Sequence, residues 1–383
     1  MMSETPHPGP TGPLDIARAA ILGGMRQLAV ELRKAVRQHG LLLAIVLAYW
    51  AVGLVIARSV KLPADATIDT YLPVYLTLMP GVLVALVVGR CIAIVCMDRP
   101  ARPLLHIGRD LRDTVFTLRR VVNALPMLGA ILVFGGTFTL IKAAMPALND
   151  YSWDAAFDTT DRWLHGGMAP WQLLQPWLGY PVVTHVINIL YAIWFLVLGT
   201  VLVWQVFSLR DQRLRLQFFW TLLTTWIFLG NIAATFLASA GPCFYGRMTG
   251  MADPYEPLMA YLREVDVTHP IWALKAQELL WQHYLTRQVE IAAGISAMPS
   301  LHVAISTLLA LLCWRTHKLL GLVMTLYAIA IMIGSVHLGW HYAIDGYFGA
   351  VGSIVIWWAV GLGLRRWGGE GDRSVALASS TPA

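Results

Sequence analysis

The chain has 383 residues, of which 57% are hydrophobic and only 13% are charged. Soluble proteins carry about a quarter charged residues, so the composition excludes an ordinary soluble domain. Several apolar runs of about twenty residues are long enough to cross a hydrocarbon core roughly 30 Å thick. We therefore expect an all-α fold, a polytopic membrane helix bundle with about eight transmembrane helices.

The formal charge of +6 does not indicate nucleic-acid binding. Lys and Arg cluster in alternate loops, which is the pattern that membrane insertion produces. The four cysteines form no CxxC motif and suggest no disulfide framework. The expected partners are instead the membrane, a lipid substrate and a polar or lipid acceptor.

The first part of the chain is expected to lie outside the membrane. Residues 1–14 are predicted to be a disordered tail, and 16–39 a basic amphipathic helix on the cytoplasmic leaflet. Eight spans are predicted after it, at 41–57, 71–97, 121–145, 181–208, 216–240, 299–314, 319–338 and 342–364. Arg90 and Lys142 are exceptional charges within these spans, and Arg90 is expected to snorkel or to face the bundle.

The segment 150–180 is too acidic to cross the membrane. Its aspartates at 150, 154, 158 and 161 recur every three or four residues and so share one helical face. Many aromatic residues accompany them, which is typical of a helix lying in the interface. We favour this structural interpretation over a cover for the site opening. A polyol headgroup could also bind the acidic face.

Loop charges predict the orientation in the membrane. Most Lys and Arg lie in the N-terminal region, the 98–120 loop, the basic turn at 209–215, the turn after the sixth span and the C-terminal tail. By the positive-inside rule, both termini are expected to be cytoplasmic, in a bacterial inner membrane or its equivalent. The sixth and eighth spans then begin at the periplasmic or luminal face.

Two histidine-bearing segments stand at these two starts. Residues 298–302 read MPSLH, and residues 341–345 read HYAID. A helix N-terminus offers unpaired N–H groups and partial positive charge, which together attract anions. Pro299 suits a first helical turn, and Ser296 or Ser300 suits a cap. We therefore expect the two helix starts to form one anion-binding cradle.

The histidines and the aspartate suggest catalysis. His341 and Asp345 are four residues apart, so on a helix they share a face. The carboxylate can fix the imidazole tautomer and raise the nucleophilicity of the other ring nitrogen. His302 is then available as a general acid. The alternative is that three polar residues satisfy one another inside the bundle, which we consider the weaker interpretation.

These residues resemble a known family. The segments 297–302 and 341–345 are similar to the second and third signatures of the type 2 phosphatidic acid phosphatase superfamily. The branch of inositol phosphorylceramide synthases looks closest, because its second signature has Leu, as at Leu301, where the phosphatases usually have Gly. In addition, 241–245, GPCFY, is similar to its aromatic first signature. The resemblance covers roughly 121–364. It implies a metal-independent phosphohistidine mechanism without cofactors, in which His341 attacks phosphorus, Asp345 orients it and His302 protonates the leaving group.

The chain departs from the phosphatase signatures in its cations. The phosphatases have an arginine where this chain has Gly334 or Ser335, and their first-signature Lys and Arg-Pro pair is missing here. Phosphate binding is therefore expected from backbone N–H groups and a few side chains. The predicted substrate-binding residues are Tyr245, Arg247, Ser300, Gly241 and Pro242.

The predicted domains follow from this resemblance. They are a cytoplasmic tail and amphipathic helix (1–40), two additional spans with a basic loop (41–120), a six-helix catalytic membrane domain (121–364) and a disordered cytoplasmic tail (365–383). The polar stretch 252–297 is expected to be an outer cap.

The predicted function is transfer of a phosphorylated headgroup, with phosphoinositol as one candidate, or of a phosphoryl group. A lipid phosphate phosphatase is the alternative.

Two other hypotheses compete with the predicted metal-independent enzyme. His337, His341 and Asp345, together with His302, would make a zinc set, although Gly339 and the end of the seventh span should break the helix between the first two. We therefore expect no metal, with His337 a hydrogen-bonding neighbour.

A lipid transporter is a remote alternative. Transporters bind their substrates near the midplane of the membrane and often contain repeats, whereas these motifs lie at the outer rim.

Overall fold

The structure, a computed structural model, describes residues 13–63, 66–286 and 294–379, which form helices and contain no strand. Most of the predicted N-terminal tail, residues 1–12, lies outside the described residues. Within them, seven helical segments are long and apolar enough to cross a membrane, at Ala17–Ser59, Tyr75–Asp98, Leu118–Leu148, Pro181–Phe207, Gln212–Phe236, Lys318–His337 and Ala343–Arg366. The chain is therefore a polytopic helical membrane protein, as its composition predicts.

The remaining predicted span is the short helix α14 (Leu301–Trp314). Its 14 residues extend for about 21 Å at roughly 1.5 Å per residue, less than a full hydrocarbon core. It packs against α9 (Gln212–Ile227), α15 (Lys318–His337) and α16 (Ala343–Ser379). Leu308 and Leu312 are fully buried, so α14 lies in the centre of the bundle.

The N-terminal helices are more continuous than predicted. The amphipathic helix and the first span form one helix, α1 (Pro13–Ser59). After α2 (Ala66–Ala93) and η1 (Ile94–Asp98), the basic loop folds as α3 (Pro103–Asp110) and η2 (Leu111–Val115). Arg90 is exposed, so it does not face the core of the bundle, and its guanidinium is paired with a carboxylate. It makes two hydrogen bonds of 2.6 and 2.7 Å to the carboxylate of Asp110.

Helix α4 (Leu118–Leu148) joins these additional helices to the rest of the bundle. It contacts α1, α2 and α8 (Trp194–Phe207). Gly53 of α1 sits against Thr137, where an added Cβ would lie 2.7 Å from the threonine methyl carbon. The aromatic rings of Tyr49 and Phe134 stack with 5.1 Å between centroids. Glycine at position 53 thus permits close packing of α1 on α4.

The middle helices turn at a buried arginine. Helices α7 (Pro181–Ala192) and α8 form the fourth span, and α9, η3 (Phe228–Ala233) and α10 (Ala234–Phe236) form the fifth. Arg215 was predicted in the basic turn between these spans; it lies in the first turn of α9 and is only 1% exposed. Its guanidinium donates to the carbonyls of Gln205 (2.7 Å) and Val206 (3.0 Å). It thereby satisfies carbonyl groups in the last turn of α8, where intrahelical donors are lacking.

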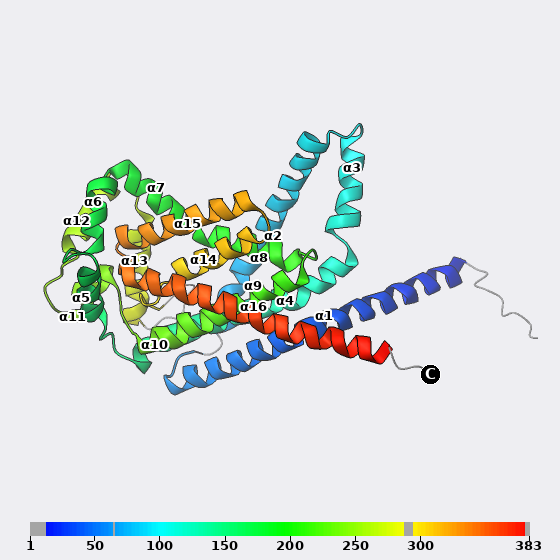
Figure 1. The fold of residues 1–383 in the computed structure, drawn as a ribbon, viewed down its shortest axis with the longest axis horizontal. Helices are drawn as coiled ribbons and strands as arrows, with labels where there is room; N and C mark the ends of the chain where they lie inside the picture. The colour runs from blue at the N-terminus through cyan, green and yellow to red at the C-terminus, as the bar shows by residue number, and fades with distance from the viewer. Residues whose placement is uncertain (1–12, 64–65, 287–293, 380–383) are drawn as a thin grey trace, which may run out of the picture.

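Short helices collect at one end of the bundle, at the left of Figure 1, and we call this group the cap. The cap comprises α5 (Asp154–Leu164), α6 (Pro170–Leu178), η4 (Pro242–Phe244), α11 (Tyr245–Thr249), α12 (Glu256–Asp266) and α13 (Trp272–Thr286). The start of α1 and the end of α16 point away from it. Helix α16 continues to Ser379, through much of the segment for which disorder was predicted.

Candidate active site

A tight loop between α15 and α16 carries His341. Helix α15 ends at His337, and Gly339 follows with φ +73°. The amides of Trp340 and His341 both donate to the carbonyl of Ser335, each at an N···O distance of 3.0 Å. A Cβ at Gly339 would lie 3.0 Å from the sulfur of Met259, so both the backbone conformation and the space favour glycine. His341 therefore precedes α16 and does not lie inside the helix as predicted.

Asp345 lies in the first turn of α16, directly behind His341. Its Oδ2 is 3.4 Å from Nδ1 of His341 and accepts a hydrogen bond of 3.0 Å from the amide of Tyr342. Asp345 is fully buried and His341 is 7% exposed. The predicted pair is thus brought together by the loop. The 3.4 Å separation exceeds an ordinary hydrogen bond, so the contact is an ion pair when the imidazole is protonated.

His302 lies in the first turn of α14. Ser300 caps this helix, its hydroxyl accepting from the amide of Val303 at 3.5 Å. Pro299 precedes the cap, so it is not part of the first helical turn as predicted. The His302 ring stacks on Tyr191, with 4.7 Å between centroids, and lies 4.4 Å from the ring of Trp194. These two aromatic residues restrict the orientation of the imidazole.

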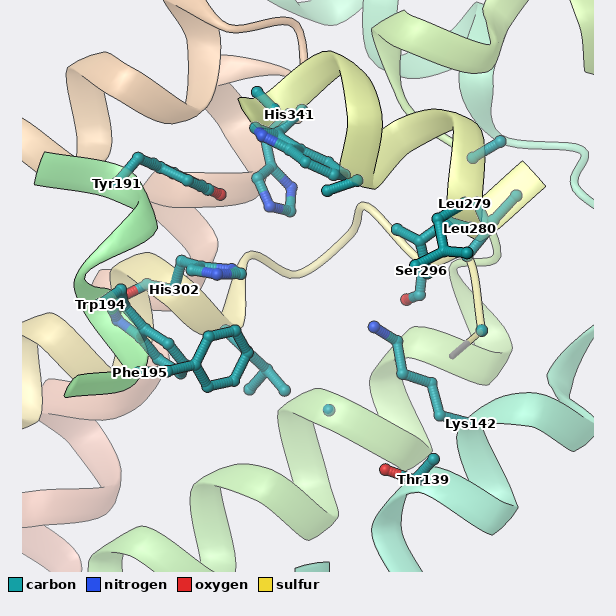
Figure 2. Close-up of a pocket in the computed structure, with 18 of the residues that line it drawn as sticks. Thr139, Lys142, Tyr191, Trp194, Phe195, Leu279, Leu280, Ser296, His302 and His341 are labelled. Carbon is teal, nitrogen blue, oxygen red and sulfur yellow. The ribbon is translucent and has the colours of Figure 1, made fainter. Parts of the chain in front are cut away.

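His302 and His341 face one cavity of about 380 Å³. Their ring centroids are 6.4 Å apart, and Figure 2 shows both imidazoles at the same side of the space. Much of the remaining wall is aromatic, contributed by Phe138, Tyr191, Trp194, Phe195, Trp226, Phe244, Trp272 and Trp340. Small-molecule sites are typically concave and mostly apolar with a few converging polar groups, and this cavity has that character.

The start of α16 is already occupied by carboxylates of the protein. Asp161 of α5 accepts the amides of Ala343 (2.6 Å) and Ile344 (2.9 Å), and Asp345 accepts that of Tyr342. The predicted cradle of two open helix N-termini is therefore wrong for α16. At α14 the first two residues, Leu301 and His302, do line the cavity.

The predicted acidic face is likewise used inside the protein. Asp154 and Asp161 are each only 1% exposed. Asp154 accepts the amides of Ala240 (2.9 Å) and Gly241 (2.8 Å) and the hydroxyl of Tyr342 (2.9 Å). Burial raises the pKa of both carboxyls, and the backbone hydrogen bonds oppose that shift. These two carboxylates join loops, so they do not form a surface for a polyol.

The five predicted substrate-binding residues do not line the cavity. Ser300, Pro242 and Tyr245 are buried. Gly241 has φ +91°, and a Cβ there would lie 2.6 Å from the carbonyl oxygen of Trp340. Arg247 pairs with Glu278 at 3.0 Å and lies over the ring of Trp281. Their observed contacts shape the cap, and a direct role in substrate binding stays a prediction.

His337 is a hydrogen-bonding neighbour, as predicted. Its Nε2 is 2.9 Å from the hydroxyl of Thr184, and the end of α15 separates it from His341. Across the described residues, no three His, Cys, Asp or Glu side chains are placed to hold a metal ion. The alternative zinc set is thus not assembled.

Sequence reasoning missed two parts of the cavity. Tyr191 and Trp194 hold His302, and their aromatic character is too common in membrane helices to single them out. Lys142 of α4 also lines the cavity. A cation within an apolar span is costly and usually functional, which was the available signal.

The family comparison covers this site. The PAP2 superfamily model matches residues 156–361, more than half of the chain. The chain belongs to the PAP2 superfamily. The match includes His302, His341 and Asp345 and begins within α5, later than the resemblance suggested. Comparisons of this PAP2 protein with curated proteins and with solved structures found no match. Members of the superfamily are phosphatases or phosphotransferases, so this is an enzyme acting on phosphate esters.

Proposed function

We propose that this PAP2 protein is a membrane lipid phosphotransferase that moves a phosphorylated headgroup, or a phosphoryl group, through a phosphohistidine. The observation that supports this most is the meeting of His302 and His341 in one mostly aromatic cavity, with Asp345 behind His341. The two histidines come from different helices, so packing has brought them together. Three polar residues that merely satisfied one another would not need to face a cavity.

The proposed reaction has two steps, formation of the phosphohistidine and its breakdown. In the first, Nε2 of His341 attacks phosphorus, the bond from phosphorus to the lipid oxygen breaks, and His302 gives its proton to that oxygen. In the second, His302 removes a proton from an acceptor hydroxyl, whose oxygen displaces His341 from phosphorus. Asp345, beside Nδ1, holds the tautomer that leaves Nε2 free. The 6.4 Å between the two rings provides room for the reacting phosphate.

Hydrolysis is the second candidate, because water in place of the acceptor hydroxyl would make the enzyme a lipid phosphate phosphatase. The aromatic wall favours an organic acceptor over water, and resemblance to inositol phosphorylceramide synthases favours phosphoinositol as the group transferred. We place the cavity at the periplasmic or luminal face, with both termini in the cytoplasm, on the basis of the loop charges.

A donor panel with purified protein in lipid nanodiscs tests the proposal. Phosphatidylinositol and phosphatidic acid are supplied with candidate acceptors, and release of free phosphate is compared with formation of a new phospholipid. We expect transfer, and a loss on the order of 1,000-fold or more in His341→Ala, because the covalent route is removed. The matched control is His317→Ala, an exposed imidazole outside the cavity, which should retain activity.

The same panel separates the alternatives. Phosphate release without a new phospholipid would identify the phosphatase. Lipid translocation that persists in His341→Ala, with no product from any donor, would identify a transporter. A folded protein that yields neither product would overturn the proposal.

A further inference from the structure

The side chains of the cavity that can carry charge near neutral pH are basic. Among the described residues that line it, these are Lys142 and the histidines His283, His302 and His341; Tyr191 is a neutral phenol, and no carboxylate or arginine is present. At neutral pH a lysine with its ordinary pKa of about 10.4 is charged, whereas a histidine with its ordinary pKa of about 6.5 is mostly neutral. Such a lining is suited to an anion, and among these described residues Lys142 provides the positive charge.

The position of Lys142 is set by the segment that leads to His302. Gly294 has φ +90° and packs on Lys142, where a Cβ would lie 2.7 Å from the lysine carbonyl oxygen and 2.9 Å from its Cγ. Figure 2 shows the ammonium of Lys142 directed into the space that His302 and His341 also face. Three separate elements, α4, α14 and the loop before α16, therefore converge on one volume.

Lys142 makes no ion pair or hydrogen bond with the described residues, although much of its side chain is withdrawn from solvent. An ammonium group in apolar surroundings is costly unless a counter-charge accompanies it. A second hydrogen-bond donor without a partner is the hydroxyl of Tyr191 in the cavity wall. Tyr191 is 7% exposed, and its hydroxyl has no hydrogen-bond partner in the described structure. A bound phosphate would supply acceptors to both donors.

Several other groups that could bind phosphate are occupied. The first amides of α16 are taken by Asp161, and Arg247 is paired with Glu278. Arg162, in the cap, is paired with Asp158 at 3.0 Å. Among the described residues that line the cavity, Lys142 is thus the cation without an ion pair, in a chain that lacks the phosphatase arginines. It also precedes the segment matched to the PAP2 superfamily, so family membership assigns it no role.

We propose that Lys142 binds the substrate phosphate and that its single charge makes the site selective for a phosphodiester. This inference rests on the proposed function for the identity of the site. With the imidazoles neutral, Lys142 supplies the one positive charge among the described residues that line the cavity. A phosphodiester carries one negative charge, whereas a phosphomonoester carries nearly two above its second pKa of about 6. The second negative charge would be buried without a partner.

Lipid binding measured without turnover tests this inference. The His341→Ala protein is placed in phosphatidylcholine nanodiscs at about pH 8, and quenching of tryptophan fluorescence reports binding. Phosphatidylmethanol and phosphatidic acid are compared, because they differ only by the methyl ester that removes one charge. We expect phosphatidylmethanol to bind about tenfold more tightly. Adding Lys142→Met should weaken its binding on the order of 100-fold, because a desolvated charge pair is lost.

Two further variants complete the experiment. Lys275→Met makes the same substitution at an exposed lysine of α13 and should leave both affinities unchanged. Lys142→Arg keeps the charge and should retain the preference for phosphatidylmethanol. Unchanged affinity in Lys142→Met, equal binding of the two lipids, or loss of the preference in a folded Lys142→Arg protein would each overturn the inference. Neither lipid is turned over in this assay, so its failure leaves the donor panel unaffected, and the reverse also holds.

Discussion

At the scale of single residues, the candidate site depends on carboxylates that do not themselves face the cavity. Asp161 and Asp154 reach from α5 to backbone amides in two other segments, at 343–344 and 240–241. Helix N-termini have amides without intrahelical partners, and a buried carboxylate satisfies them well. The geometry of His341 and Asp345 is thereby tied to α5, a helix outside the catalytic motifs.

Asp161→Ala is expected to destabilise the protein by about 2–4 kcal/mol, because two buried amides of α16 lose their acceptor. Chemical unfolding in detergent, followed by circular dichroism, measures this effect. Asp150→Ala is the control, since that aspartate is exposed and its side chain makes no hydrogen bond within the described structure. Equal stability of the two variants would show that Asp161 does not hold the start of α16.

At the scale of elements, α4 connects the two additional helices to the cavity. It packs on α1 and α2 and carries Phe138 and Lys142, which line the cavity. The additional helices lie outside the segment matched to the family. Through their contacts with α4 they pack behind the wall that presents the lysine.

Gly53→Val is expected to destabilise the protein by about 1–3 kcal/mol, because the new side chain would force α1 away from Thr137 on α4. A lowered midpoint of thermal unfolding is the measurement. Gly24→Val lies on the same helix, where an added Cβ meets nothing within 4 Å, and controls for the loss of glycine itself. If Gly53→Val unfolds at the same temperature as Gly24→Val, the close packing of α1 on α4 is wrong.

At the scale of the whole molecule, the cap lies at one end of the helix bundle, and the start of α1 and the end of α16 lie at the other. Seven long spans and the shorter α14 would together bring both ends of the chain to one face. The basic loops predict that this face is cytoplasmic. An outer cap would then admit lipid headgroups and acceptors from the other compartment.

Labelling of single cysteines in intact cells tests this orientation. In a background with the four natural cysteines replaced, Val267→Cys in the cap should react with a membrane-impermeant maleimide. Arg210→Cys, in the exposed turn between α8 and α9, should react only after the membrane is permeabilised. The reverse pattern would place the cap in the cytoplasm and contradict the positive-inside assignment.

Composition and local pattern were sufficient for the membrane class and for the positions of the long spans. They also predicted that His341 meets Asp345, although the loop before α16, and not a shared helix, brings the two side chains together. Each of these depends on residues close together in the sequence, such as apolar runs or a spacing of four. The break after His337 was also predictable, because Gly339 adopts a backbone conformation that other residues avoid. Even the superfamily followed from two short segments, 297–302 and 341–345.

Contacts between distant segments required the tertiary structure. The sequence alone placed the aspartates of α5 on one exposed face, whereas packing turned Asp154 and Asp161 inward to cap loops more than eighty residues away. The same packing filled the predicted anion cradle at α16 and directed Lys142 of α4 toward the two histidines. Periodicity states which residues share a face of a helix. Only the packing of that helix against others determines what the face meets.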